Sequence, residues 1–121
     1  MKTQLNIERS ALLIELGMPK HKASATELYK DPISQWTGKG CPVFTLDDLL
    51  RELPKYLDYE FEGEKYAADF TFHWSNRFLH YEAGYDLYDM WDKSHYCAPE
   101  LIDALYYLTV WCLKNGYLKY E

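Results

Sequence analysis

Several patterns that mark common protein classes are missing from this chain of 121 residues. Its three cysteines, Cys41, Cys97 and Cys112, have no CxxC spacing. We therefore expect reduced thiols in a cytoplasmic protein. The most apolar stretch, residues 104–113, is much shorter than the roughly 20 residues of a membrane-spanning helix. The N-terminus lacks the apolar core and small-residue cleavage site of a signal peptide, and we expect no membrane partner.

Basic residues and catalytic motifs are also scarce. The chain has 13 Lys and Arg residues and 19 Asp and Glu residues, and its net charge is −6 at pH 7. A nucleic-acid binder needs cations that displace counterions, so we expect no nucleic-acid partner. No GxSxG, HExxH or GxxxxGK[ST] motif occurs, and no cofactor is expected. Cys97, two residues after His95 and just before a predicted helix, is the thiol best placed to ionise, with an inert packed thiol as the alternative.

Aromatic and apolar residues are abundant by contrast. Hydrophobic residues make up 48% of the chain and aromatic residues 17%, including 12 Tyr. This composition argues against disorder, and the length predicts a single domain over residues 1–121. Large aromatic side chains either fill a small core or line a binding surface.

Alternation of apolar and polar residues predicts a three-stranded antiparallel meander over about residues 56–83. Turns at Gly63-Glu64 and Ser75-Asn76 would connect the strands. In this register Tyr59 faces Ala68, and Phe72 faces Leu79. One face of the sheet is then apolar and aromatic, and the other is polar.

Capping residues and periodicity predict three helices, over about residues 7–16, 46–53 and 99–114, packed on one face of the sheet. Asn6 and Thr45 are good N-caps, and Asn115-Gly116 is a strong stop. Residues 18–43 are expected to form a long connection, with a short helix near 24–29 and with Trp36 pinned to the body. Residues 85–97 are expected to form an ordered loop. The fold class is α+β.

The polar face of the predicted meander carries an unusual row of carboxylates. Asp58 would lie opposite Asp69, and Asp69 opposite Glu82, with His80 diagonal to the row. Like charges at this spacing destabilise a sheet, so a cation is expected nearby. Oxygen ligands so placed would suit Ca²⁺, Mg²⁺ or Mn²⁺, or would raise the pKa of one carboxyl for acid–base catalysis. The alternative is a solvated polar face neutralised by a lysine.

The last predicted helix is apolar on nearly all sides, which is typical of a helix buried on more than one side. It either lies beneath the other helices or packs against a second copy of the chain. In the second case the interface would include Tyr106, Val110, Trp111 and Leu113.

Three stretches support a resemblance to known proteins. They are residues 41–50 (CPVFTLDDLL), 99–105 (PELIDAL) and 111–118 (WCLKNGYL). In these helix starts and stops the chain resembles small uncharacterised proteins of bacterial prophages and mobile elements with a helix–meander–helix layout. The resemblance implies an intracellular accessory protein without assigned activity, and it transfers no functional residue.

Two hypotheses for the function follow. The first is a non-catalytic protein-interaction module, self-associating as a homodimer or acting as an acidic partner of a basic protein. The second is a small metal-dependent or acid–base enzyme that uses the face of Asp58, Asp69, Glu82 and His80. We favour the first, which rests on the apolar last helix, the high aromatic content and the acidity of the chain.

Overall fold

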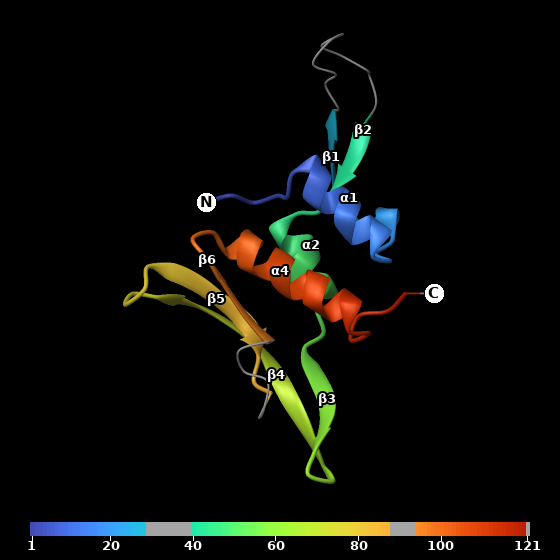
Figure 1. Ribbon diagram of the computed structural model, residues 1–121. Helices are drawn as coiled ribbons and strands as arrows, with labels where there is room; N and C mark the ends of the chain where they lie inside the picture. Colours follow the sequence, from blue (N-terminus) through green and yellow to red (C-terminus); the bar gives the residue numbers. More distant parts are fainter. Residues whose placement is uncertain (29–39, 88–93, 121) are drawn as a thin grey trace.

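The described part of the chain contains two antiparallel sheets and three α-helices, an α+β arrangement as predicted (Figure 1). The computed structural model describes residues 1–28, 40–87 and 94–120. Its elements in chain order are α1 (Ile7–Glu15), η1 (Lys20–Lys22), β1 (Ala25–Leu28), β2 (Gly40–Val43), α2 (Leu46–Glu52), β3 (Tyr56–Phe61), β4 (Glu64–Ser75), β5 (His80–Tyr85), β6 (His95–Ala98) and α4 (Leu101–Lys114).

Helices α1 and α2 begin where the capping signals predict, whereas α4 begins at Leu101, two residues after its predicted start. The Asn6 side chain accepts a hydrogen bond from the Arg9 backbone amide at 2.8 Å. Thr45 and Asp48 form a reciprocal capping box at the start of α2, which satisfies two backbone donors that lack partners within the helix. After α4, Gly116 has a φ of 76°, a left-handed conformation that suits glycine at a helix end.

The pairing of β3 with β4 differs from the predicted register by two residues. Tyr59 lies opposite Tyr66 rather than Ala68. The turn is Glu62-Gly63, and both of its residues have positive φ, 52° and 80°. A two-residue turn with positive φ at both positions matches the twist of the flanking strands, as the predicted Gly63-Glu64 turn would have done, so the local sequence does not distinguish the two registers.

The pairing of β4 with β5 differs from the predicted register by four residues. Phe72 lies opposite Ala83 rather than Leu79, and residues 76–79 form a loop in place of the predicted two-residue turn. Ser75 holds this loop, because its hydroxyl accepts a hydrogen bond from the Phe78 amide and its carbonyl accepts one from the Leu79 amide. Both register shifts are even, so the predicted sets of side chains still share a face.

The main sheet has four strands in the order β3-β4-β5-β6, not three. Strand β6 pairs with β5, and its first three residues fall in residues 85–97, which were predicted to be a loop. The two strands approach closely at Gly84, where an added Cβ would lie 2.6 Å from the His95 ring. Only glycine leaves room for this ring. The acidic and aromatic composition around β6 hides the short alternation that marks a strand.

The predicted connection over residues 18–43 contains a second sheet. Strands β1 and β2 pair with Ala25 opposite Val43. Residues 25–28 are therefore a strand, and the predicted helix near 24–29 is wrong. Their backbone groups find partners across the hairpin, which local sequence does not reveal. Trp36 and residues 88–93 of the predicted loop lie outside the described residues.

Helix α4 lies between the main sheet and the other two helices (Figure 1). It packs against β5 and β6, while α1 and α2 pack against α4, and α1 also packs against β2. Thus α4 lies directly on the sheet and the others cover α4, which refines the prediction that all three helices pack on one face. The core includes Leu57, Ala68, Ala83 and Tyr85 from the sheet and Leu105 and Leu108 from α4.

Candidate functional site

The predicted row of three carboxylates does not form. Asp58 lies opposite Ala67, and Asp69 lies opposite Tyr56. Glu82 lies opposite His73. The two register shifts move each carboxylate along the sheet relative to its neighbour, so the acids share a face but not a row. The predicted metal or acid–base site built on Asp58, Asp69 and Glu82 is therefore wrong as an arrangement.

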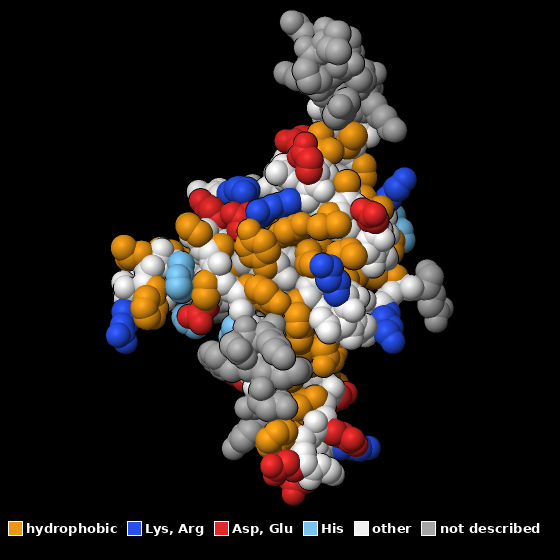
Figure 2. Space-filling view, in the orientation of Figure 1, with side chains coloured by type: hydrophobic (Ala, Val, Ile, Leu, Met, Phe, Trp, Pro, Cys, Tyr) orange, Lys and Arg blue, Asp and Glu red, His pale blue; other side chains and the backbone are white. Residues whose placement is uncertain are grey.

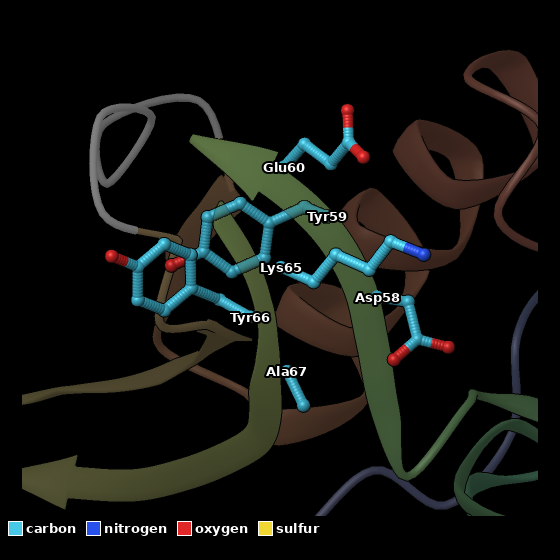
Figure 3. A pocket seen from close by; sticks show the side chains of 6 residues that line it. All are labelled: Asp58, Tyr59, Glu60, Lys65, Tyr66 and Ala67. Carbon is cyan, nitrogen blue, oxygen red and sulfur yellow. The ribbon is translucent and has the colours of Figure 1, made fainter. Parts of the chain in front are cut away.

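Asp58 has a lysine neighbour within the sheet itself. Lys65 lies opposite Glu60 and diagonal to Asp58. Figure 3 shows the Lys65 side chain extending between those of Glu60 and Asp58, with the Tyr59 and Tyr66 rings on the other side of the hairpin. These two rings are stacked with centroids 5.5 Å apart. A cross-strand lysine therefore lies between the two carboxylates and lowers their mutual repulsion.

The other two predicted site residues, Glu82 and His80, lie together in a different cluster. His73, Glu82 and Cys97 occupy one row across β4, β5 and β6. The His73 Nε2 atom lies 3.4 Å from Glu82 Oε2, and the His80 Nε2 atom lies 4.0 Å from the same oxygen. The ligand atoms of His80, Glu82 and Cys97 all lie within 4.8 Å of one another. We call these four residues the His–Glu–Cys cluster.

Cys97 is not the ionised thiol that its position near a helix start suggested. Partial desolvation and the negative charge of Glu82 raise the pKa of Cys97. The thiol is solvent-exposed, but it stays protonated at neutral pH unless a cation displaces the proton. Nucleophilic catalysis by Cys97 has no support in this geometry.

A second notable feature is the edge of β4. Its first half, Glu64–Asp69, pairs with β3, and its second half, Phe70–Ser75, pairs with β5. Figure 1 shows β3 and β5 leaving β4 in different directions. No described strand pairs with the second half on the side away from β5. We call this stretch, Phe70–Ser75, the open β4 edge.

Large apolar side chains are exposed along the open β4 edge and around its end. Phe72 is 47% exposed and Trp74 is 42% exposed, although both lie on the apolar face of the sheet. Phe78 and Leu79 are exposed in the loop that follows. Figure 2 shows hydrophobic side chains at this left-hand end of the molecule, beside a basic one. These residues extend past the part of the sheet that α4 covers.

The predicted interface residues on α4 are mostly covered within the chain. Tyr106 is buried, and the Arg9 guanidinium lies 4.6 Å from the centre of its ring. Val110 and Trp111 are half-buried and line an open hollow of about 290 Å³ that also includes Tyr96 and Tyr107. Leu113 is half-buried. Much of the apolar surface of α4 is therefore explained by the sheet, α1 and α2.

Cys97 is the residue of the His–Glu–Cys cluster that the sequence did not place in this site. His73 alternates onto the polar face with His80, a signal visible in the sequence. Cys97 joins them only because β6 is a strand beside β5, and that pairing has no local signal. The exposure of Phe72 and Trp74 likewise depends on where β3 and α4 end, not on the alternation pattern.

No protein-family model matches this chain, and neither does any curated protein or solved structure. Among the described helices, none combines the length and apolar character needed to cross a membrane.

Proposed function

We propose that this protein is a non-catalytic interaction module that self-associates through the open β4 edge. The observation that carries the proposal is an edge with no described partner strand and with two large aromatic side chains exposed along it. Exposed apolar strand edges are templates for pairing with another chain. A second copy of this chain is the occupant that we propose.

The backbone direction along this edge follows from one hydrogen bond. The Phe70 amide donates to the Lys55 carbonyl at 2.9 Å, on the side away from β5. Because backbone groups alternate along a strand, the amides and carbonyls of Phe72 and Trp74 point to the same side. These are also the residues whose rings are exposed. Main-chain hydrogen bonds and aromatic contacts would therefore form together.

The open β4 edge is suited to pairing with itself. An antiparallel pair of identical edges obeys two-fold symmetry, in which each residue meets its counterpart or a near neighbour. Residues 70–75 contain no Asp, Glu, Lys or Arg, so no like charges would oppose each other. Strand β3 carries Asp58 and Glu60, and self-pairing of its outer edge would bring carboxylates together.

The test is the mass of the protein in solution by sedimentation equilibrium. We expect a concentration-dependent dimer of the 14.4 kDa chain. Trp74→Lys should weaken it at least about tenfold, because a central interface aromatic contributes on the order of 2 kcal/mol. Phe72→Pro should act similarly, because it removes an outward-pointing amide and leaves the bonds to β5 in place.

Tyr56→Lys is the matched control. Tyr56 is 56% exposed and lies opposite Asp69 on the polar face of the sheet, whereas the Phe72 and Trp74 rings lie on the apolar face, so this variant should dimerise like the wild type. Circular dichroism would confirm that all variants are folded. A wild-type protein that stays monomeric at high micromolar concentration, or equal weakening by Trp74→Lys and Tyr56→Lys, would contradict the proposal.

A further inference from the structure

The polar face of β4, β5 and β6 concentrates the metal-binding side chains of this protein. Three of the four histidines, His73, His80 and His95, lie on this face, and so does Cys97. Within this group, His73, Glu82 and Cys97 form a row across three strands, and His80 lies beside Glu82 on the same strand. We propose that the His–Glu–Cys cluster binds Zn²⁺ on the polar face of the sheet, opposite the face that carries the exposed rings of Phe72 and Trp74.

The distances suit a tetrahedral zinc ion after small side-chain rotations. With Zn–N distances of about 2.0–2.1 Å and Zn–S of about 2.3 Å, neighbouring ligand atoms lie roughly 3.3–3.8 Å apart. The distances from the Glu82 oxygen to the two imidazole nitrogens are 3.4 and 4.0 Å. The ligand atoms of His80, Glu82 and Cys97 lie within 4.8 Å of one another. Movements of about 1 Å would bring His80, Glu82 and Cys97 to this spacing. His73, whose Nε2 atom lies 3.4 Å from Glu82 Oε2, would complete the site by rotating its exposed side chain toward the other two ligands.

The chemistry of the donors selects the metal. Two imidazole nitrogens, one thiolate and one carboxylate suit zinc, whereas Ca²⁺ and Mg²⁺ prefer oxygen ligands only. Zinc binding displaces the thiol proton of Cys97, as thiolate coordination requires. The predicted oxygen-only site for Ca²⁺, Mg²⁺ or Mn²⁺ is thus replaced by a mixed site for a softer ion.

The surroundings of Glu82 support a cation at this place. Its ion-pair partners in the described part of the chain are His73 and His80, and no described Lys or Arg pairs with it. The ring of Phe78 stacks on His80 with centroids 5.6 Å apart, which holds the imidazole in position. With four protein ligands the site is closed, and the ion would tie β4, β5 and β6 together rather than activate water.

The experiment is a titration of chelator-treated, reduced full-length protein with Zn²⁺ alone, in competition with a chromophoric zinc indicator. Four single variants each remove one donor: His73→Ala, His80→Ala, Glu82→Gln and Cys97→Ser. Loss of a group that merely orients a metal ligand typically costs 10–100-fold in affinity, so loss of a ligand should cost at least about 100-fold. Zn²⁺ should also raise the melting temperature of the wild type, and this rise should vanish in each variant.

Matched controls separate this site from adventitious binding. Cys41→Ser removes a thiol elsewhere, and Asp69→Asn removes a carboxylate of the same face outside the cluster. Both should bind Zn²⁺ like the wild type. Co²⁺ in place of Zn²⁺ should give a thiolate-to-metal absorption band that Cys97→Ser abolishes and Cys41→Ser retains. Equal affinity of the Cys97→Ser and Cys41→Ser variants, or no binding by the wild type at micromolar Zn²⁺, would overturn the site and show an ordinary imidazole–carboxylate pair. Sedimentation of the zinc-free protein tests self-association separately.

Discussion

Asp48 shows how one residue joins two parts of the chain. It is 1% exposed and accepts hydrogen bonds from the backbone amides of Thr45 and Ser24, from the Ser24 hydroxyl and from Arg51. Burial alone raises the pKa of the Asp48 carboxyl, but these backbone and hydroxyl hydrogen bonds outweigh it, and the pKa lies below its ordinary value of 3.8. The charged carboxylate thus fastens the segment before β1 to the start of α2.

Asp48→Asn should lower the free energy of unfolding by about 1–3 kcal/mol at pH 7, because an amide leaves buried donors unsatisfied. The folded-state pKa is depressed, so the stabilisation is present above about pH 3.8 and is lost as the pH falls through the folded-state pKa. The difference between wild type and variant should therefore shrink below about pH 4. Urea unfolding at pH 7 and pH 3 measures it, and a difference that stays constant would disprove the role of the carboxylate charge.

At the scale of elements, β4 organises the main sheet. It pairs with β3 through one half and with β5 through the other, and its side chains alternate between the apolar and the polar face of the sheet. Ala67 and Ala68 are adjacent on β4 and fall on opposite faces. Ala68 is 2% exposed and packs in the core, whereas Ala67 is exposed.

This adjacent pair provides a test of the face assignment. Ala68→Lys places a long charged side chain in the core and should destabilise the fold by about 3 kcal/mol or more. Ala67→Lys points outward, opposite Asp58, and should change stability by no more than about 0.5 kcal/mol. Chemical denaturation of the two variants gives both values, and similar losses in both would show that the faces are misassigned.

At the scale of the whole molecule, α4 is covered from both sides. Cys112 on α4 is fully buried, and the Tyr85 hydroxyl from β5 donates to the Pro54 carbonyl at 2.6 Å. Burial raises the pKa of Cys112 to about 12, and a hydrogen bond with Tyr85 offsets part of this effect. The helix, the sheet and the segment after α2 therefore meet at one packed point.

Cys112 should report on opening of the whole fold. A maleimide at neutral pH should label exposed Cys97 and half-buried Cys41, while Cys112 should react only when the molecule unfolds. In denaturant all three thiols should react. Mass spectrometry of proteolytic fragments after timed labelling measures this. If Cys112 is labelled as fast as Cys41 under native conditions, the packing of α4 differs from that described.

Local signals in the sequence were sufficient to predict the helices with strong caps and the strands with long alternation. The helix ends are marked by residues that satisfy backbone groups within a few positions of the chain, namely Asn6, Thr45 and Asn115-Gly116. Two strands were not predicted, because their signals are not local. Residues 25–28 and 95–98 are short strands whose paired residues lie more than ten positions away in the sequence, so composition favoured a helix and a loop there.

What the sequence alone determined about this protein is which side chains share a face, because side-chain direction alternates at every residue and survives any even shift of register. The tertiary structure decided which side chains are neighbours. The turns at Glu62-Gly63 and residues 76–79 moved Asp58 and Asp69 away from Glu82, and the pairing of β5 with β6 brought Cys97 beside it. Phe72 and Trp74 are exposed because β3 and α4 end before they reach these residues. Proximity across strands depends on turn conformation and on contacts between distant segments, and neither is encoded in a local pattern.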